Sequence, residues 1–458
     1  MPHLTRPRLR LWLLFVTALV ALVGVSATPA PARADTPSTI QAAYAATGGA
    51  AGPLGAATSA ETCGLPQGGC TQGFEHGTYY WRESTGAHYV LSGVLATGYA
   101  ALGGPGGAVG YPVTDPSCTP GLCAQQFASG DVLTSSPVRG LHHLTGGAAG
   151  QWWSYEGNVA GGLGDPISDS YAVGAWHEVD FQRGSLVDYG DLYPYVVKVQ
   201  YALSDEWLSW GRAAGMGLPI AAESCGLVGG GCLQRFQDGA LYWSPATGAR
   251  AVRFALAQGY RGIAEQNGGL GYPVAEEGCG KRSGGCSQEF QGGTELWSPA
   301  SGALAVRGAL RSAYRAQGWE NGRLGYPVTN EACGKRSGGC SQEFQGGTEL
   351  WSPAGGAHSV LGAIRAEYQA QGWENGVLGY PISDEACGKR DGGCSQEFQG
   401  GTVLWSPSSG AHLVTGAVRS AYAARGWENS GYGYPVAEPT GAGNGRSAQR
   451  FQGGSITA

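Results

Sequence analysis

Twelve cysteines are the residues best placed to do chemistry, and they occur as six close pairs. Five of the six pairs have the spacing C-x6-C. A zinc site would need two pairs for each ion and usually a spacing of two to four residues within a pair. Close pairs in an even number instead predict disulfides in an oxidising compartment. We therefore predict six local disulfides and no metal site; the pairs are Cys63–Cys70, Cys118–Cys123, Cys225–Cys232, Cys279–Cys286, Cys333–Cys340 and Cys387–Cys394.

Histidines and neighbouring carboxylates are the other groups that could act as acids or bases. Three histidines share one repeat position, which holds Arg250 and Leu304 in other copies. A catalytic base would not be replaced by leucine in a working copy, so we interpret these histidines as turn residues at the surface. Adjacent acids such as Glu276 and Glu277 follow a proline turn, where acids more often cap the turn than flank a substrate. The three histidines are His88, His358 and His412.

Sequence motifs for catalysis are missing from the chain. There is no Gly-x-Ser-x-Gly, no His-Glu-x-x-His and no Gly-x4-Gly-Lys-Ser/Thr. We therefore expect neither an enzyme nor a cofactor. One alternative is a hydrolase with its site in the irregular region 124–200, which has no regular cysteine pair. The acid and base residues of that region are His142, His143, His177, Glu178, Asp180, Asp188 and Asp191.

A repeat of about 54 residues organises the whole chain. Residues 279–300 are identical to residues 333–354, and a third copy that begins at Cys387 differs at only three positions. A phenylalanine and a Leu-Gly-Tyr-Pro corner recur with the same period. Such self-similarity predicts a stacked array in which no unit buries a core alone. The predicted array covers 35–458, and its eight units are 40–93, 94–147, 148–200, 201–254, 255–308, 309–362, 363–416 and 417–458, the last of them truncated.

The sequence of each unit predicts about three short strands and one short helix. Residues 309–317 have apolar residues four apart among alanines, which indicates an amphipathic helix that ends at Gly318. The corner follows, then the cysteine loop, then two strands on either side of Gly346-Gly347, which is a hairpin signal. A third strand is expected near 358–361. The fold class is therefore a β-rich repeat protein, closed into propeller-like rings or running as an open solenoid.

Aromatic residues at fixed repeat positions are the candidate ligand contacts. The tryptophans of the Trp-Ser-Pro segments favour a role in the core, because large aromatic side chains dominate burial. The tryptophans of the Gly-Trp-Glu-Asn segments lie just past a helix end. At that place, burial in the core and contact with a ligand are equally expected. The corner tyrosines are the next candidates for a sugar-binding surface. The candidate contacts are Trp319, Trp373, Trp427, Tyr326, Tyr380 and Tyr434.

Residues 1–34 have the layout of a secretory signal peptide. Arginines precede an apolar run from Leu11 to Val25, and Ala32-Arg33-Ala34 is a small-x-small cleavage site. Cleavage would remove four arginines and no acid, leaving 24 basic and 34 acidic side chains. That balance is unfavourable for binding nucleic acid or an anionic membrane surface. We expect a secreted protein without a membrane anchor after cleavage.

The sequence resembles the LGFP-repeat family from residue 40 to residue 458. The resemblance rests on the Leu-Gly-Tyr-Pro corner, on Gln-x-Phe-x-Gly-Gly and on Trp-Ser-Pro-x-(Thr/Ser/Gly)-Gly-Ala-His. It implies a non-covalent cell-wall anchoring module of exported actinobacterial proteins. Many family members carry a hydrolase or acyltransferase domain before the repeats, and we expect no such domain in this sequence.

These observations lead to one expected function and two alternatives. We expect an exported, non-catalytic protein that binds cell-wall polysaccharide, either peptidoglycan or arabinogalactan-like, through many weak and identical sites. Such sites at fixed spacing add their affinities when the ligand is a polymer. The alternatives are the hydrolase in region 124–200 and a structural or protein-interaction protein of the cell surface.

Overall fold

The computed structural model describes residues 38–190 and 196–458, so the predicted signal peptide lies outside the described residues. Within these ranges the chain forms eight antiparallel sheets, seven of four strands and one of three. Short helices connect consecutive sheets. The prediction of a β-rich repeat protein is confirmed.

The strands of the first four sheets are as follows. They are β1 (Thr62–Leu65), β2 (Gly69–Phe74), β3 (Gly77–Arg82) and β4 (Gly86–Leu91); β5 (Ser117–Thr119), β6 (Leu122–Gln126), β7 (Val132–Ser136) and β8 (Gly140–Leu144); β9 (Tyr171–Val173), β10 (Trp176–Phe181), β11 (Gly184–Asp188) and β12 (Val196–Gln200); and β13 (Ser224–Leu227), β14 (Gly231–Phe236), β15 (Gly239–Ser244) and β16 (Gly248–Arg253).

The remaining four sheets repeat this order. Their strands are β17 (Gly278–Cys279), β18 (Cys286–Phe290), β19 (Gly293–Ser298) and β20 (Gly302–Arg307); β21 (Ala332–Cys333), β22 (Cys340–Phe344), β23 (Gly347–Ser352) and β24 (Gly356–Leu361); β25 (Ala386–Cys387), β26 (Cys394–Phe398), β27 (Gly401–Ser406) and β28 (Gly410–Thr415); and β29 (Thr440–Gly441), β30 (Ser447–Phe451) and β31 (Gly454–Thr457). The helices are α1 (Thr39–Ala46), α2 (Val94–Ala101), α3 (Gly146–Ser154), α4 (Tyr201–Ser209), α5 (Ala213–Met216), α6 (Phe254–Gly262), α7 (Gly308–Ala316), α8 (Gly362–Ala370) and α9 (Gly416–Ala423).

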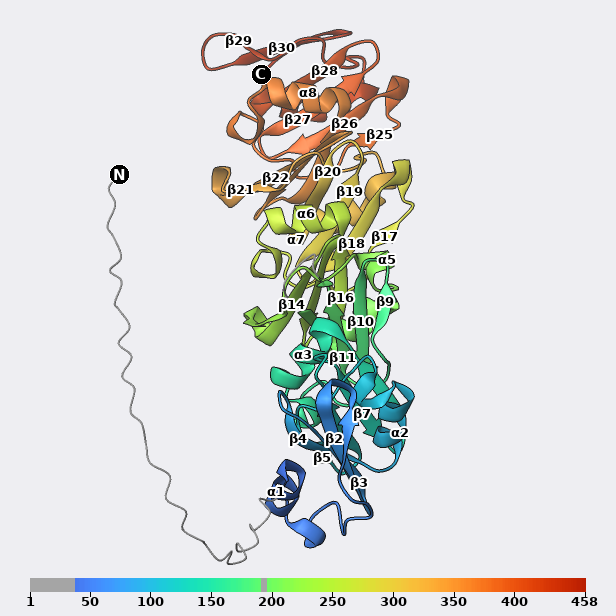
Figure 1. Ribbon diagram of the computed structural model, residues 1–458. Helices are drawn as coiled ribbons and strands as arrows, with labels where there is room; N and C mark the ends of the chain where they lie inside the picture. The colour runs from blue at the N-terminus through green and yellow to red at the C-terminus, as the bar shows by residue number, and fades with distance from the viewer. Residues whose placement is uncertain (1–37, 191–195) are drawn as a thin grey trace, which may run out of the picture.

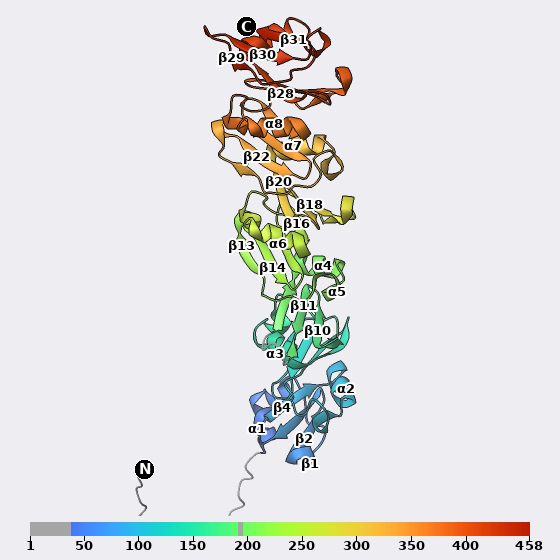
Figure 2. The ribbon, with the colours of Figure 1, turned by 90° about the horizontal axis from the view of Figure 1, so that it is seen from above.

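The sheets follow one another in chain order along one long axis, with α1 at one end and the C-terminus at the other (Figures 1 and 2). Helices α2 to α4 and α6 to α9 each pack between the sheet before them and the sheet after them, as α6 does between β15–β16 and β19–β20. The core is therefore divided into layers, one for each junction. In one layer, Leu296 and Val306 of one sheet meet Tyr314 of α7 and Phe344 of the next sheet.

The number of strands per repeat was predicted one too low. The missed strand carries the first cysteine of each pair, and in β17, β21 and β25 it is only two residues long. So short a segment has no readable alternation of apolar and polar residues. The six predicted disulfides are confirmed, and where the loop has eight residues they join directly opposed cysteines, such as Cys279 and Cys286.

The corner tyrosine attaches each repeat to the cysteine loop of the repeat before it. The hydroxyl of Tyr326 donates to the backbone oxygen of Arg282 at 2.7 Å. Its ring covers Gly285, where an added Cβ would lie 2.1 Å from the hydroxyl oxygen. The loop must therefore be closed, and the residue before its second cysteine must be glycine, to leave room for the ring. The equivalent hydrogen bonds run from Tyr111 to Pro66, from Tyr272 to Val228, from Tyr380 to Arg336 and from Tyr434 to Arg390.

The cysteine loop and the next corner tyrosine occur together along the chain. Every eight-residue loop that the disulfides close is followed by a corner tyrosine. The shorter loop Cys118–Cys123 is followed by Asp165, and the third repeat, which has no disulfide, is followed by Leu218. The disulfide thus maintains a binding surface for the neighbouring repeat, a role that the sequence did not reveal.

A buried glutamine makes a second connection between repeats. The side-chain amide of Gln288 donates to Ala251 of the preceding sheet at 2.7 Å and to Ala275 of its own corner at 2.9 Å. Buried polar groups need such partners, and this one links two sheets. The glutamines that bridge in the same way are Gln125, Gln234, Gln342, Gln396 and Gln449.

The repeated histidines also join neighbouring repeats. The ring of His358 lies 3.2 Å from the carboxylate of Asp384 in the next corner, and the same carboxylate accepts the backbone N–H of Ser359. His88 pairs with Asp115 and His412 with Glu438 in the same way. These histidines therefore lie at the junctions between repeats, where they hold a strand to the next corner.

Two glutamates break the apolar pattern of the core. Glu295 and Glu349 are 0% exposed, and neither of their carboxyl groups has a hydrogen-bond partner among the described residues. Burial raises the pKa of each to about 8, so each is held as the neutral acid near neutral pH. In the other six sheets, the residue at the equivalent position of the strand pairing is not a glutamate. These residues are Tyr79, Leu133, Leu186, Leu241, Val403 and Ile456.

The Gly339→Ala substitution should destabilise the array. The new methyl group would meet the hydroxyl of Tyr380 at 2.2 Å, so the ring must leave its place on the loop. We expect a loss of about 1–3 kcal/mol in unfolding free energy, measured by chemical denaturation. Gly278→Ala is the control, because the nearest atom to its new methyl group is a carbonyl oxygen 4.0 Å away. Equal losses for both variants would show that the tyrosine contact is unimportant.

Stability should fall as the pH rises from about 5 to about 8. In that interval the native protein retains protons on Glu295 and Glu349 that the unfolded chain, with its ordinary glutamate pKa, has released. Each group then lowers the unfolding free energy by up to about 1.4 kcal/mol per pH unit. Below pH 4 the penalty disappears.

The matched variant for this prediction is Glu349→Leu, which copies the natural Leu241. Denaturation at pH 5, 6.5 and 8 should show a smaller pH slope and a higher stability at pH 8 than in the parent. An unchanged slope would mean that Glu349 is charged in the folded state.

Candidate ligand-binding site

The three Gly-Trp-Glu-Asn tryptophans lie on an unusual backbone. Each begins a single-turn 3₁₀ helix, η9 (Trp319–Asn321), η11 (Trp373–Asn375) or η13 (Trp427–Asn429), with φ of 55° or 56°. Residues with a Cβ adopt this left-handed conformation only at a cost, and such strain is often found at functional sites. The earlier repeats have Gly49, Gly104, Asn158, Arg212 and Glu265 at the equivalent place.

The indole of each tryptophan is partly buried and partly open. Trp319 packs edge-to-face on the buried Tyr314, with ring centroids 5.3 Å apart, and the guanidinium of Arg311 lies 5.6 Å from its centroid. Trp373 and Trp427 make the same two contacts. The ring is therefore anchored to the core along one edge, while the rest of it is only partly buried.

A hydrogen-bonded group of three side chains stands beside the indole. Arg311 of α7 donates to the carboxylate of Glu289 at 2.6 Å and to the hydroxyl of Thr294 at 2.6 Å. The Thr294 hydroxyl in turn donates to Glu289 at 2.9 Å. The same three contacts recur for Arg365, Glu343 and Thr348, and for Arg419, Glu397 and Thr402.

A second ion pair completes the site. The ammonium of Lys281, on the cysteine loop, lies 3.9 Å from the carboxylate of Glu320, whose residue is 4% exposed. The pairs Lys335–Glu374 and Lys389–Glu428 repeat it at 3.5 and 3.6 Å. Each cation in this group of pairs is thus compensated by a carboxylate.

These residues surround a pocket of about 630 Å³. Its walls come from the corner, the cysteine loop, two strands, the following helix and the tryptophan turn. The pocket is large enough for a small-molecule ligand. The lining includes Val274, Ala275, Lys281, Glu289, Arg311 and Trp319.

In the third and fourth repeats internal ion pairs occupy the equivalent place. Arg212 stands where the later repeats have tryptophan, and its guanidinium binds Tyr171 and the carboxylates of Glu178 and Asp180. In the fourth repeat the charges are exchanged, and Arg235 pairs with Glu265 at 3.0 Å. The complete set of tryptophan, arginine, glutamate, threonine and lysine is found only in the three later repeats.

The irregular region 124–200 does not gather its acids and bases in one place. Glu178 and Asp180 are held by Arg212, while Asp188 accepts backbone N–H groups of Ala148 and Gly190. The rings of His142 and His143 lie beside different carboxylates, those of Asp169 and Asp131. His177 lies in β10, and Asp191 is outside the described residues.

The prediction that the corner tyrosines contact the ligand was wrong. Tyr326, Tyr380 and Tyr434 are 1, 2 and 0% exposed, and their hydroxyls are used by the preceding loop. Residue type alone does not distinguish an exposed tyrosine from a buried one. The helix arginines of the site were missed, although one signal could have found them: they occur only in repeats that also carry Gly-Trp-Glu-Asn.

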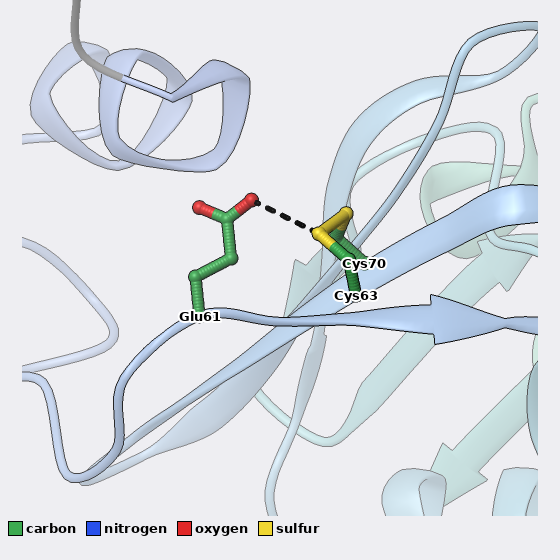
Figure 3. A group of neighbouring side chains, drawn as sticks. All are labelled: Glu61, Cys63 and Cys70. Carbon is green, nitrogen blue, oxygen red and sulfur yellow. Dashed lines mark hydrogen bonds between the residues drawn. A yellow bond between two sulfur atoms is a disulfide. The ribbon is translucent and has the colours of Figure 1, made fainter.

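Acidic side chains beside the disulfides do not form a metal site in this state. Figure 3 shows the carboxylate of Glu61 pointing toward the disulfide between Cys63 and Cys70, and similar groups occur in three other repeats. A disulfide sulfur is neither a thiolate ligand nor a proton donor. The 3.9 Å approach of Glu61 is therefore a contact and not a hydrogen bond.

The fold and the site define a β-rich repeat protein with disulfide-closed loops. The chain belongs to the LGFP-repeat family, whose model matches residues 54–107, 216–268, 270–322, 324–376 and 378–430. Each of the last three matched segments contains one complete site, from the corner to the tryptophan turn. No curated protein matches the chain.

Solved structures similar to the chain provide no further identification. The extracellular domain of BT3049 from B. thetaiotaomicron has 11% identity and a TM-score of 0.13, and the match covers 73% of this chain and 38% of that one. PorZ of Porphyromonas gingivalis has 9% identity and a TM-score of 0.15, with 85 and 50% covered. The chain thus spans half or less of their lengths, and such low TM-scores carry no argument. Among the described residues, no helix is long and apolar enough to cross a membrane.

Replacing the site tryptophans with glycine should change stability little. The Trp373→Gly substitution removes the contact with Tyr368 but also relieves the left-handed backbone, and glycine is the natural residue at Gly49 and Gly104. We expect a change within about 1 kcal/mol. Tyr368→Ala, at a fully buried position, should instead cost about 3–5 kcal/mol. Similar losses in thermal or chemical unfolding would place the tryptophan in the core.

Proposed function

We propose that this chain is an exported, non-catalytic protein that binds cell-wall polysaccharide, peptidoglycan or arabinogalactan-like, through its three repeated tryptophan sites. The observation that carries the proposal is the threefold recurrence of a half-open indole on a strained backbone, framed by the same polar side chains. Sugar rings pack their C–H faces on indole, and arginine, asparagine and glutamate side chains can bind the hydroxyls. The six disulfides fit an oxidising, extracellular setting.

The arrangement of the repeats supports binding to a polymer. The repeats form an open row (Figure 2), so equivalent sites can contact successive parts of one polysaccharide chain. Once one site has bound, the others bind at a high effective concentration, and weak contacts sum to a large apparent affinity. A net negative charge disfavours nucleic acid and anionic membranes as partners.

The test is co-sedimentation of the full-length protein with purified wall polysaccharide. The triple variant Trp319→Gly, Trp373→Gly and Trp427→Gly should lose apparent affinity by about 100-fold, whereas each single variant should lose little. Asn158→Gly is the matched control, because it changes the same left-handed turn position in a repeat without the site.

Three outcomes would contradict the proposal. Unchanged binding by a folded triple variant would move the site elsewhere. Absence of binding by the parent would favour a structural or protein-interaction role at the cell surface. Release of dye from labelled wall material would favour the hydrolase, with region 124–200 as the first place to mutate.

A further inference from the structure

A second cavity adjoins the pocket at Trp319. Its volume is about 560 Å³, and its lining includes Glu206 and Trp210 at the end of α4, Arg250 of β16 and Glu276 of the next corner. Both cavities share Val274 and Ala275 as a common wall. The two cavities therefore adjoin at one corner, across the junction of the fourth and fifth repeats.

Trp210 gives this second cavity an aromatic surface like that of the first. Its indole is partly exposed, and its N–H donates to the carboxylate of Glu206 at 2.8 Å. The guanidinium of Arg253 lies 3.7 Å from its centroid and so covers one face of the ring. A fixed indole with a polar partner therefore stands in each cavity, Trp210 in one and Trp319 in the other.

The charges that line both cavities balance. The four cations are Lys281, Arg250, Arg311 and Arg315, and the four acids are Glu206, Glu276, Glu289 and Glu320. Three of the cations are already paired: Arg250 with Glu276 at 3.4 Å, Arg311 with Glu289 and Lys281 with Glu320. Burial and the neighbouring Glu206 raise the pKa of Glu276 to about 7, so the balance is complete only above neutral pH. A polyanion would need several unpaired cations, and these cavities do not supply them.

We propose, building on the function proposed above, that the two cavities form one extended site for an internal stretch of an uncharged polysaccharide. One sugar packs on Trp319 and another part of the same chain packs on Trp210. The shared wall at Val274 and Ala275 gives the chain a continuous path between them. An isolated monosaccharide fills only one of the two cavities, and a polyphosphate or polyuronate chain is disfavoured.

The test uses the full-length parent in which Trp373→Gly and Trp427→Gly have removed the other two sites. Neutral arabinogalactan fragments of increasing length are titrated by calorimetry, with poly(glycerol phosphate) as the anionic probe. Affinity should rise with length until both cavities are filled. Binding of the neutral fragments should change less than about twofold between about 50 and 500 mM NaCl, because no net charge is neutralised.

The Trp210→Ala substitution should lower affinity for long fragments about tenfold, toward that of short fragments, and leave short fragments unaffected. Leu208→Ala, exposed on the same helix and outside the cavity lining, is the control. Trp210→Phe retains a ring at this position and should restore part of the loss, provided that the melting temperatures agree.

The results separate the two proposals. Equal losses for long and short fragments, or no dependence on length, would overturn the two-cavity site while leaving glycan binding intact. Preference for poly(glycerol phosphate) with strong salt dependence would overturn the uncharged ligand. If the parent binds none of the polymers, the proposed function fails and this inference fails with it.

Discussion

The hydrogen bond from each corner tyrosine to the preceding cysteine loop is the constraint on which five of the seven junctions between repeats depend. It requires a closed loop, a residue without Cβ where the ring lies, and a corner at a fixed distance along the chain. Tyr326, Arg282 and Gly285 meet these three requirements at one junction. The same loop also carries Lys281, which faces the ligand pocket. Stacking and binding therefore use one loop, so a change that loosens the junction should also move a wall of the site.

Much of the fold could be predicted because its rules are local and periodic. Cysteine spacing predicts the disulfides, and glycine, proline and apolar spacing predict the helix, the corner and the hairpin within a single copy. The role of the corner tyrosine could not be predicted in this way. Its partner is a backbone oxygen more than 40 residues earlier, and backbone oxygens leave no mark in a sequence. The strand β17 was missed because its two residues are too few to show an alternation of apolar and polar side chains.

The candidate site was predicted in part for a similar reason. The sequence left Trp319 between core and ligand contact, and the structure places its ring between the two settings, with one edge packed on Tyr314 and the ring only partly buried. The polar side chains beside the indole were not predicted as a group, because Arg311 and Glu289 lie 22 residues apart, one on a helix and the other on a strand. Glu289 and Arg235 occupy the same repeat position with opposite charges. Arg235 pairs with Glu265 and Glu289 pairs with Arg311, so in the third to seventh repeats this position and its partner carry complementary charges.

Two features of the later repeats cost stability. A left-handed tryptophan and a buried, unpaired glutamate each cost stability, and natural proteins retain such costs mainly at functional sites. Thr294 and Glu295 are neighbours on β19, so they point to opposite faces of the sheet: one lines the pocket and the other lies in the interface behind it. The seventh repeat, however, has the complete site with Val403 at the glutamate position. The left-handed turn also occurs at Asn158, Arg212 and Glu265, in repeats without the site. The tryptophan itself therefore accompanies the site, whereas the buried glutamate is a separate feature of the two junctions that contain it.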